Sequence, residues 1–256
     1  ASALNRWPWV RAYQSVDRFL DEETPEIVSI CTWPDSHVDL IERAADAGVQ
    51  GILCEKPLAL SMPAIRRARN VADSADVRLA GGHQYRFHPN FTATADLLAQ
   101  GAIGAVERLE GHVAGALADN GPHVIDAARF LLGDPQAVRV TCSMQSDTPK
   151  AYQGIPVETA ARSTIVFDID GCELPLELIS GTDAPGIMGI VVRGDRGTIE
   201  VDREGLRIDG QPHPRGTSPK LLDYHRRQVR EFVEWVRGTR PEYAADADVA
   251  ATAAEI

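Results

Sequence analysis

The sequence is poor in basic residues and contains no long apolar run. Its 256 residues include 26 Lys and Arg against 37 Asp and Glu, which gives a formal net charge of −11. A nucleic-acid-binding surface needs a basic face, so we expect no nucleic-acid partner. No apolar stretch approaches the ~20 residues of a membrane-spanning helix, and no secretory signal opens the chain. We therefore expect no membrane partner either.

Cysteine is also scarce. The four cysteines form no Cys-x-x-Cys pair, which argues against a zinc site. His83, His88 and His112 lack the spacing of metal ligands, so we predict no metal site. Cys31 and Cys54 each end an apolar run that is typical of a buried strand, where a free cysteine acts as a small hydrophobe. These features favour a reduced, cytoplasmic protein.

Glycine is present, but never in the spacing of a dinucleotide fingerprint. Among the 21 glycines no two lie two positions apart, so the Gly-x-Gly-x-x-Gly motif is absent. Residues 1–14 show no strand pattern, and the last helical stretch has no stop signal. We expect that a first βαβ unit, of roughly 30 or more residues, precedes Ala1 in the intact protein and that the C-terminus is cut. The alternative is a natural protein that never bound a dinucleotide. This chain is expected to bind dinucleotides weakly, because the loop and helix N-terminus that hold the pyrophosphate are missing.

The first 80 residues alternate between short apolar runs and helical patterns. Residues 26–32, 49–54 and 77–80 predict three buried strands. Between the first two, apolar residues recur at helical spacing, with Ser36 and Asp39 as a capping box and Gly48 just past the helix end. Ser61 and Pro63 begin the next helix. Strand–helix–strand repeats of this kind predict parallel strands joined by right-handed crossovers.

The pattern changes after Gly82. Leu174, Leu176 and Leu178 alternate with polar residues, which is typical of an antiparallel sheet with one covered face. Strands are predicted near 106–113 and at 137–144, 160–169, 172–180, 187–193 and 197–202. Helices are predicted near 91–100, 122–132 and 219–237, with one more helical stretch at the C-terminus.

The fold class that follows is α/β with two domains. Residues 1–82 are predicted to form a partial dinucleotide-binding domain, with a Rossmann-type doubly wound parallel sheet. Residues 83–256 are predicted to form an α+β catalytic, substrate-binding and oligomerisation domain, with a large, mostly antiparallel sheet and C-terminal helices. An exposed sheet face is often covered in a symmetric assembly, so we expect a homo-oligomer, either a dimer or a tetramer.

Four ordered motifs lie on this framework. Thr32-Trp33-Pro34 with His37 follows the first strand, and Glu55-Lys56-Pro57 follows the second. Gln84-Tyr85-Arg86-Phe87-His88-Pro89 lies at the domain junction, and the segment from Asp119 through His123 to Asp126 opens a helix. In this order and spacing they resemble the signature of the Gfo/Idh/MocA family, which takes its name from glucose–fructose oxidoreductase and inositol dehydrogenase. The resemblance covers about residues 15 to 240, although the loop 114–118 is shorter than in many members.

The resemblance implies an NAD(P)-dependent oxidoreductase. Such an enzyme transfers a hydride between nicotinamide and a small-molecule substrate, here a polyol, a sugar or a related cyclic alcohol or carbonyl. The implied cofactor is NAD or NADP, and the choice between them stays open. The implied cofactor-binding residues are Thr32, Trp33, Pro34, His37, Glu55, Lys56, Pro57 and Gln84. The implied catalytic residues are Lys56 and His123 as acid/base groups with Asp119 as their partner, and the implied substrate-binding residues are Lys56, Tyr85, Arg86, Asp119 and His123.

Each of these residues also has a plainer interpretation. Lys56 lies at the carboxyl end of a parallel strand, where ligands bind, but it can also be a surface lysine that caps a loop. His123 has an imidazole suited to acid–base work near neutrality, or is a first-turn histidine with its hydrogen bonds satisfied. Asp119 is otherwise a helix cap. Arg86 is equally suited to an ion pair that pins the domain junction, and Asp126 to a structural role.

Two other functional classes compete with an oxidoreductase. A non-catalytic relative, acting as a sugar-binding or regulatory module, is favoured by the missing phosphate-binding loop. A metal hydrolase is disfavoured, because it needs clustered histidines and carboxylates and only His123, Asp119 and Asp126 lie close together in the sequence.

Overall fold

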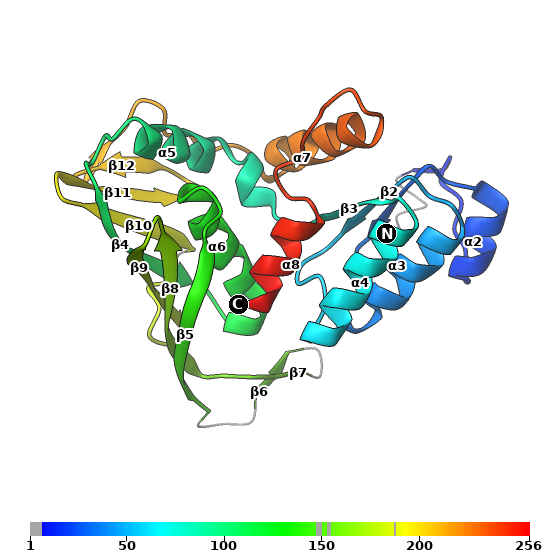
Figure 1. Cartoon of the computed structure of the whole chain (residues 1–256), viewed down its shortest axis with the longest axis horizontal. Coiled ribbons are helices and arrows are strands. Elements are labelled where there is room, and N and C mark those ends of the chain that lie inside the picture. The colour runs from blue at the N-terminus through cyan, green and yellow to red at the C-terminus, as the bar shows by residue number, and fades with distance from the viewer. Residues whose placement is uncertain (1–6, 147–149, 153–154, 187) are drawn as a thin grey trace.

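A computed structural model describes residues 7–146, 150–152, 155–186 and 188–256 (Figure 1). The chain forms two units, each with its own sheet. Residue 187, the first of the predicted strand 187–193, lies outside the described residues. Within these ranges, no helix combines the length and the apolar character needed to cross a membrane.

The first unit is the predicted parallel α/β arrangement. Strands β1 (Ile27–Ile30), β2 (Gly51–Cys54) and β3 (Arg78–Gly81) form a three-stranded parallel sheet in that order. Helices α3 (His37–Asp46) and α4 (Met62–Ser74) connect these strands and cover the face that carries Ile30, Ile52 and Cys54. A short helix, α2 (Val16–Glu23), precedes β1.

Two local expectations in this unit fail, and one is confirmed. Ser36 does not cap α3, because a 3-10 turn (η1, Pro34–Ser36) precedes the helix and the Ser36 hydroxyl donates to Thr32 and to the Trp33 carbonyl instead. Cys31 is exposed, since β1 ends one residue earlier and leaves it at the open edge of the sheet. Ser61 caps α4 as predicted, accepting from the Ala64 N–H.

The second unit is built on an eight-stranded sheet. The strand order is β13-β12-β11-β10-β4-β9-β8-β5. The central strands are β4 (Val106–Val113), β9 (Cys172–Gly181) and β8 (Ala160–Ile169), flanked by β5 (Gln136–Gln145) and by β10 (Gly189–Gly194), β11 (Gly197–Asp202), β12 (Leu206–Ile208) and β13 (Gln211–Pro212). All neighbours are antiparallel except β4 and β9, which run parallel, so the prediction of a mostly antiparallel sheet is confirmed. A separate two-stranded ribbon joins β6 (Lys150–Tyr152) to β7 (Ile155–Val157).

The two faces of this large sheet differ. Helices α5 (Pro89–Ala99) and α6 (Leu117–Leu131) cover one face and share an apolar core with Leu109, Leu176 and Val192. On the opposite face Arg193 of β10 donates to Glu110 of β4 at 2.7 Å. That face carries no helix in Figure 1.

The C-terminal segment returns to the first unit. Helix α7 (Leu221–Val236) covers the second face of the small sheet, where Phe232 and Val236 lie against Gly51. After it, the Ala245 carbonyl accepts from the Gly81 N–H at 2.8 Å, which extends the edge of β3. Helix α8 (Ala247–Glu255) then lies between α4 and α6 (Figure 1) and places Ala250 and Ala251 in the core of the first unit.

Candidate active site

A cavity of about 320 Å³ opens at the carboxyl ends of β1 and β2. This is the edge at which ligands bind in parallel α/β sheets. The first unit supplies most of its walls, and the second unit closes it with the first turn of α6 and the end of β7. The lining residues are Cys31, Thr32, Trp33, Pro34, Glu55, Lys56, Pro57, Leu60, Ala118, Asp119 and Val157. Residues of the motif that begins at Thr32 and of Glu55-Lys56-Pro57 therefore face Asp119, from a third predicted motif, across one cavity.

Lys56 joins the two units inside this cavity. Its ammonium group donates to the backbone carbonyl of Asp119 at 2.6 Å and to the carboxylate of Asp119 at 3.0 Å. The side chain is only 13% exposed. An ammonium group has three N–H donors, so these contacts leave one for a ligand.

His123 lies one helical turn beyond Asp119 and is buried. Burial lowers the pKa of His123 to about 3, and the positive charge of Lys56 acts in the same direction. Its ring lies 5.5 Å from that of Tyr85, which in turn stacks on Phe91 at 4.8 Å. The Nδ1 atom has no hydrogen-bond partner among the described residues. The imidazole is therefore neutral at pH 7 and keeps an unused polar atom.

His37 supports the cavity from behind instead of lining it. It is fully buried, and its ring nitrogens lie 3.0 Å from the Pro57 carbonyl and 3.0 Å from the Thr32 carbonyl. These contacts join the loops that follow β1 and β2. Trp33, which is 49% exposed, lines the cavity beside Thr32 and Pro34.

The loop after β3 approaches Glu55 closely. A Cβ atom on Gly82 would lie 2.8 Å from a Glu55 carboxylate oxygen and 3.2 Å from its Cα, so this position needs glycine. Glu55 also accepts from the Lys56 N–H at 3.2 Å.

His225 of α7 lies close enough to Glu55 and His123 to interact with them electrostatically, although it does not line the cavity. Burial lowers its pKa, with Glu55 opposing the shift, and its charge would in turn lower the pKa of His123. Its Nε2 atom is buried without a partner among the described residues. No motif marks this position, since it lies in an ordinary amphipathic helix far along the chain.

The predicted cofactor residue Gln84 and the predicted substrate residues Tyr85 and Arg86 lie outside the cavity lining. Gln84, Tyr85 and Arg86 fall in a 3-10 turn, η2 (Gln84–Phe87), and none of the three lines the cavity. Arg86 is buried and donates to Asp126 from Nε and Nη2, at 2.9 and 2.8 Å, and to Asp134 at 2.8 and 2.5 Å. Burial alone would lower the pKa of Arg86, but the carboxylates of Asp126 and Asp134 more than offset this effect and raise the pKa. Of the two interpretations of Arg86, these contacts support the ion pair at the domain junction.

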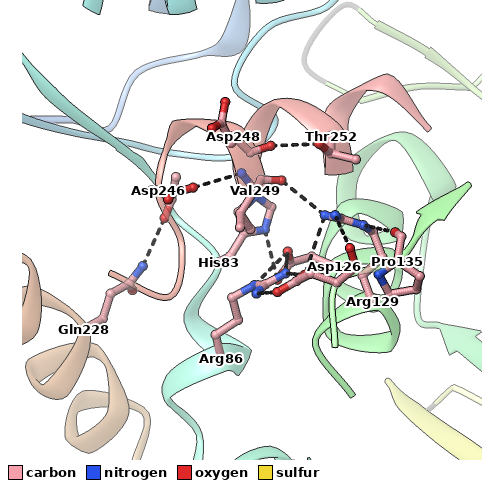
Figure 2. Close-up of polar contacts among 12 residues, drawn as sticks. His83, Arg86, Asp126, Arg129, Pro135, Gln228, Asp246, Asp248, Val249 and Thr252 are labelled. Carbon is pink, nitrogen blue, oxygen red and sulfur yellow. Dashed lines mark hydrogen bonds and ion pairs between the residues drawn. The ribbon is translucent and has the colours of Figure 1, made fainter. Parts of the chain in front are cut away.

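Figure 2 shows that this ion pair is part of a larger buried network. The Nδ1 atom of His83 lies 3.5 Å from the Asp126 carboxylate, and burial lowers the pKa of His83 although Asp126 opposes the shift. Arg129 of α6 donates to the carbonyls of Pro135 and Val249, at 3.2 and 3.4 Å. The network thus ties the junction turn, α6 and α8 together.

In the part of the chain that the structure describes, no three His, Cys, Asp or Glu side chains are grouped so that they could hold a metal ion.

Comparison with known proteins identifies the family. Residues 1–83 match the sequence model described as "Oxidoreductase family, NAD-binding Rossmann fold", and residues 107–200 match the "GFO/IDH/MocA C-terminal domain". The chain therefore belongs to the Gfo/Idh/MocA family of oxidoreductases, as its motifs predicted.

Individual relatives support this assignment. The chain is 33% identical to inositol 2-dehydrogenase of Rhizobium meliloti over 153 residues, which are 54% of this chain and 45% of that protein. It is 26% identical over 220 residues to an uncharacterized oxidoreductase of Schizosaccharomyces pombe, covering 78% of this chain and 58% of the relative. The chain thus spans only about half of the length of these curated relatives.

Solved structures agree on the fold. The aldose-aldose oxidoreductase of Caulobacter crescentus, crystallised with glycerol, has a TM-score of 0.79 at 22% identity, covering 95% of this chain and 78% of that one. GenD2 from gentamicin A biosynthesis, in complex with NAD, also has a TM-score of 0.79 at 22% identity, covering 98% and 79%.

Proposed function

We propose that this protein is an NAD(P)-dependent dehydrogenase or reductase that acts on the hydroxyl group of a polyol or sugar, or on the matching carbonyl. The observation that carries the proposal is the contact between Lys56 and Asp119 inside the cavity. It brings a buried ammonium group and a carboxylate together where two units meet, and His123 lies one turn away.

The cavity suits the nicotinamide end of a dinucleotide. It lies at the carboxyl edge of the parallel strands, and Trp33, Pro34 and Leu60 give it a flat, apolar lining. Thr32, Trp33, Pro34 and Pro57 would hold the nicotinamide ring, and His37 would hold the two loops in place. Bound nicotinamide would supply the hydride acceptor, or the donor in the reverse direction. Gln84 does not line the cavity, and the proposal assigns it no contact with the nicotinamide.

The protein groups would handle the proton. Lys56 would donate its free N–H to the substrate oxygen and stabilise the negative charge that grows there as the hydroxyl proton leaves. His123 would accept that proton, or return it during reduction. Its lowered pKa keeps it neutral in the free protein, and the negative charge that grows on the substrate oxygen would have to raise this pKa for the transfer. Asp119 would hold the Lys56 ammonium group in place.

The charges around the cavity favour a neutral substrate. The lining includes the Lys56 ammonium, which Asp119 already pairs, and the carboxylate of Glu55. No arginine is among the lining residues, so a substrate carboxylate would find no bidentate partner there. Hydroxyl groups, in contrast, both donate and accept hydrogen bonds.

The test is the formation of reduced nicotinamide by the protein as its gene encodes it. NAD and NADP would each be offered with myo-inositol, D-xylose and D-glucose as probe substrates. Lys56→Met is expected to lower kcat about 100-fold or more, because it removes the donor at the substrate oxygen. Lys220→Met, at an exposed lysine, is the matched control and should keep wild-type activity.

The same experiment distinguishes the proposed oxidoreductase from the second candidate function, a non-catalytic module. A sugar-binding or regulatory module would bind the probe sugars in calorimetry but would reduce neither cofactor. Sugar binding without turnover would therefore overturn the proposed oxidoreductase activity.

A further inference from the structure

Helix α6 carries the catalytic candidates but has no cap of its own. Its N-cap residue is Ala116, whose side chain cannot accept a hydrogen bond. The first N–H groups of a helix have no partner within the helix. The N–H groups of Asp119 and Asn120 turn back to the Ala116 carbonyl, at 3.2 and 3.0 Å, but that of Leu117 does not.

A residue from another part of the chain supplies the missing acceptor. The Leu117 N–H donates to the carboxylate of Glu158 at 2.5 Å. Glu158 lies between β7 and β8, 41 residues further along. The hydroxyl of Ser180 in β9 donates to the same carboxylate oxygen at 2.9 Å and holds it in position.

This cap bears directly on Asp119, which occupies the third position of α6. In a capping box, an acidic side chain at the third position turns back to the N–H of the N-cap residue, which here is Ala116. Glu158 already bonds the Leu117 N–H and places a negative charge at the positive end of the helix dipole, and the Asp119 carboxylate binds Lys56 instead of turning back.

The same segment also forms part of the cavity wall. Val157, the residue before Glu158, lines the cavity beside Ala118 and Asp119. The backbone next to it is fixed as well, because the Gly181 N–H donates to the Gly115 carbonyl at 3.0 Å just before α6 begins. The cavity wall and the cap of α6 are therefore formed by adjacent residues of one segment.

We propose that Glu158 is a positioning residue: it caps α6 from outside and keeps Asp119 turned toward Lys56. The proposal rests on the function proposed above. It adds a residue that touches neither cofactor nor substrate, and whose effect passes through the first turn of α6.

The first test is structural and needs no turnover. Glu158→Ala should speed hydrogen exchange at the amides of Leu117 to Asn120, whereas Glu158→Gln, which keeps an acceptor oxygen, should protect them nearly as well as the wild type. Glu242→Ala, at an exposed glutamate, is the matched control. Unchanged exchange in Glu158→Ala would overturn the capping contact itself.

The second test is kinetic. Glu158→Ala should lower kcat about 10-fold or more with little change in KM, because a misplaced catalytic group costs rate more than binding. Glu158→Gln should recover most of this loss. Should Glu158→Ala fail to fold, Ser180→Ala tests the same contact, with a smaller loss of kcat in the same direction.

A double-mutant cycle separates positioning from general stability. If Glu158 acts through Asp119, then Glu158→Ala should cost almost nothing further in an Asp119→Asn background. Independent, multiplying losses would overturn the positioning role. An inactive wild type would instead refute the proposed function, and the exchange experiment would still decide whether Glu158 caps α6.

Discussion

His123 and two histidines from other parts of the chain, His83 and His225, have imidazoles that burial keeps neutral. Burial is the main reason that the pKa values of His83, His123 and His225 are lowered. A neutral ring costs much less to bury than a cation, and it can accept a proton or a hydrogen bond. The positive charge near the substrate position therefore stays on Lys56, where Asp119 orients it.

The pKa of His123 makes stability depend on pH in a definite direction. The imidazole has a pKa of 6.5 in its ordinary state and about 3 in the folded protein, so between these values the unfolded chain binds the proton more tightly. The part of the free energy of unfolding that depends on a neutral His123 is therefore fully present above pH 6.5. It is lost as the pH falls from 6.5 toward 3. Between the two pKa values, the free energy of unfolding falls by up to about 1.4 kcal/mol for each pH unit.

Urea unfolding near pH 6.5 and near pH 5 checks this expectation. His123→Gln should lose less free energy of unfolding over that interval than the wild type, by roughly 1.5 kcal/mol. Equal losses in the two proteins would contradict a buried, neutral His123.

Among the elements, α6 depends most on charges outside itself. Its first turn binds Glu158, and its later turns carry Asp126 and Arg129, both buried in the network of Figure 2. Asp126→Asn should destabilise the protein by about 3 kcal/mol, because it removes one of the two carboxylates that compensate the buried charge of Arg86.

Denaturant titration measures this difference. The control is Arg18→Gln at the exposed pair with Glu22 in α2, where a loss below about 1 kcal/mol is expected. Similar losses in the two variants would show that the buried network contributes no more than a surface ion pair.

Local sequence predicted most elements, and the failures have a physical cause. The strands 160–169 and 172–180 were expected almost where β8 and β9 lie, since their alternation is a local property. Helix α6 was expected to begin at Pro122, a residue suited to a first turn, but it begins at Leu117. The additional turn is capped by Glu158, and no pattern near residue 117 reveals so distant a partner.

In the candidate site, too, local motifs mark some residues, whereas the positions of others depend on distant parts of the chain. Lys56, Asp119 and His123 could be predicted because motifs mark them. The structure joins Lys56 to Asp119, and His123 lies one turn further along α6 without lining the cavity. The position of Arg86 could not be read from its motif, because its two carboxylates come from later parts of the chain. His225 carries no local signal at all.

At the scale of the whole molecule, the eight-stranded sheet has one face that no described helix covers (Figure 1). On that face the half-buried Ile179 of β9 lies between Arg162 of β8 and His112 of β4, and the pair Arg193–Glu110 is only half-buried. We expect this face to be the interface of a homo-oligomer.

Sedimentation equilibrium tests the assembly. Ile179→Lys should raise the dissociation constant about 100-fold, since it buries a charge without a partner. Val229→Lys, on the exposed side of α7, should leave the dissociation constant unchanged. A wild type that stays monomeric at every concentration would contradict the expected interface.

The position of α8 has a consequence for biosynthesis. The ribosome releases the N-terminal part of the chain first, and domains commonly fold in that order. In this protein Ala250 and Ala251 complete the core of the first unit, and Ala245 pairs with the edge of β3. These contacts can form only after residues 245–251 have been synthesised. The nascent first unit must therefore wait with an open apolar surface through the synthesis of the entire second unit, and it is during this interval that a chaperone would be needed.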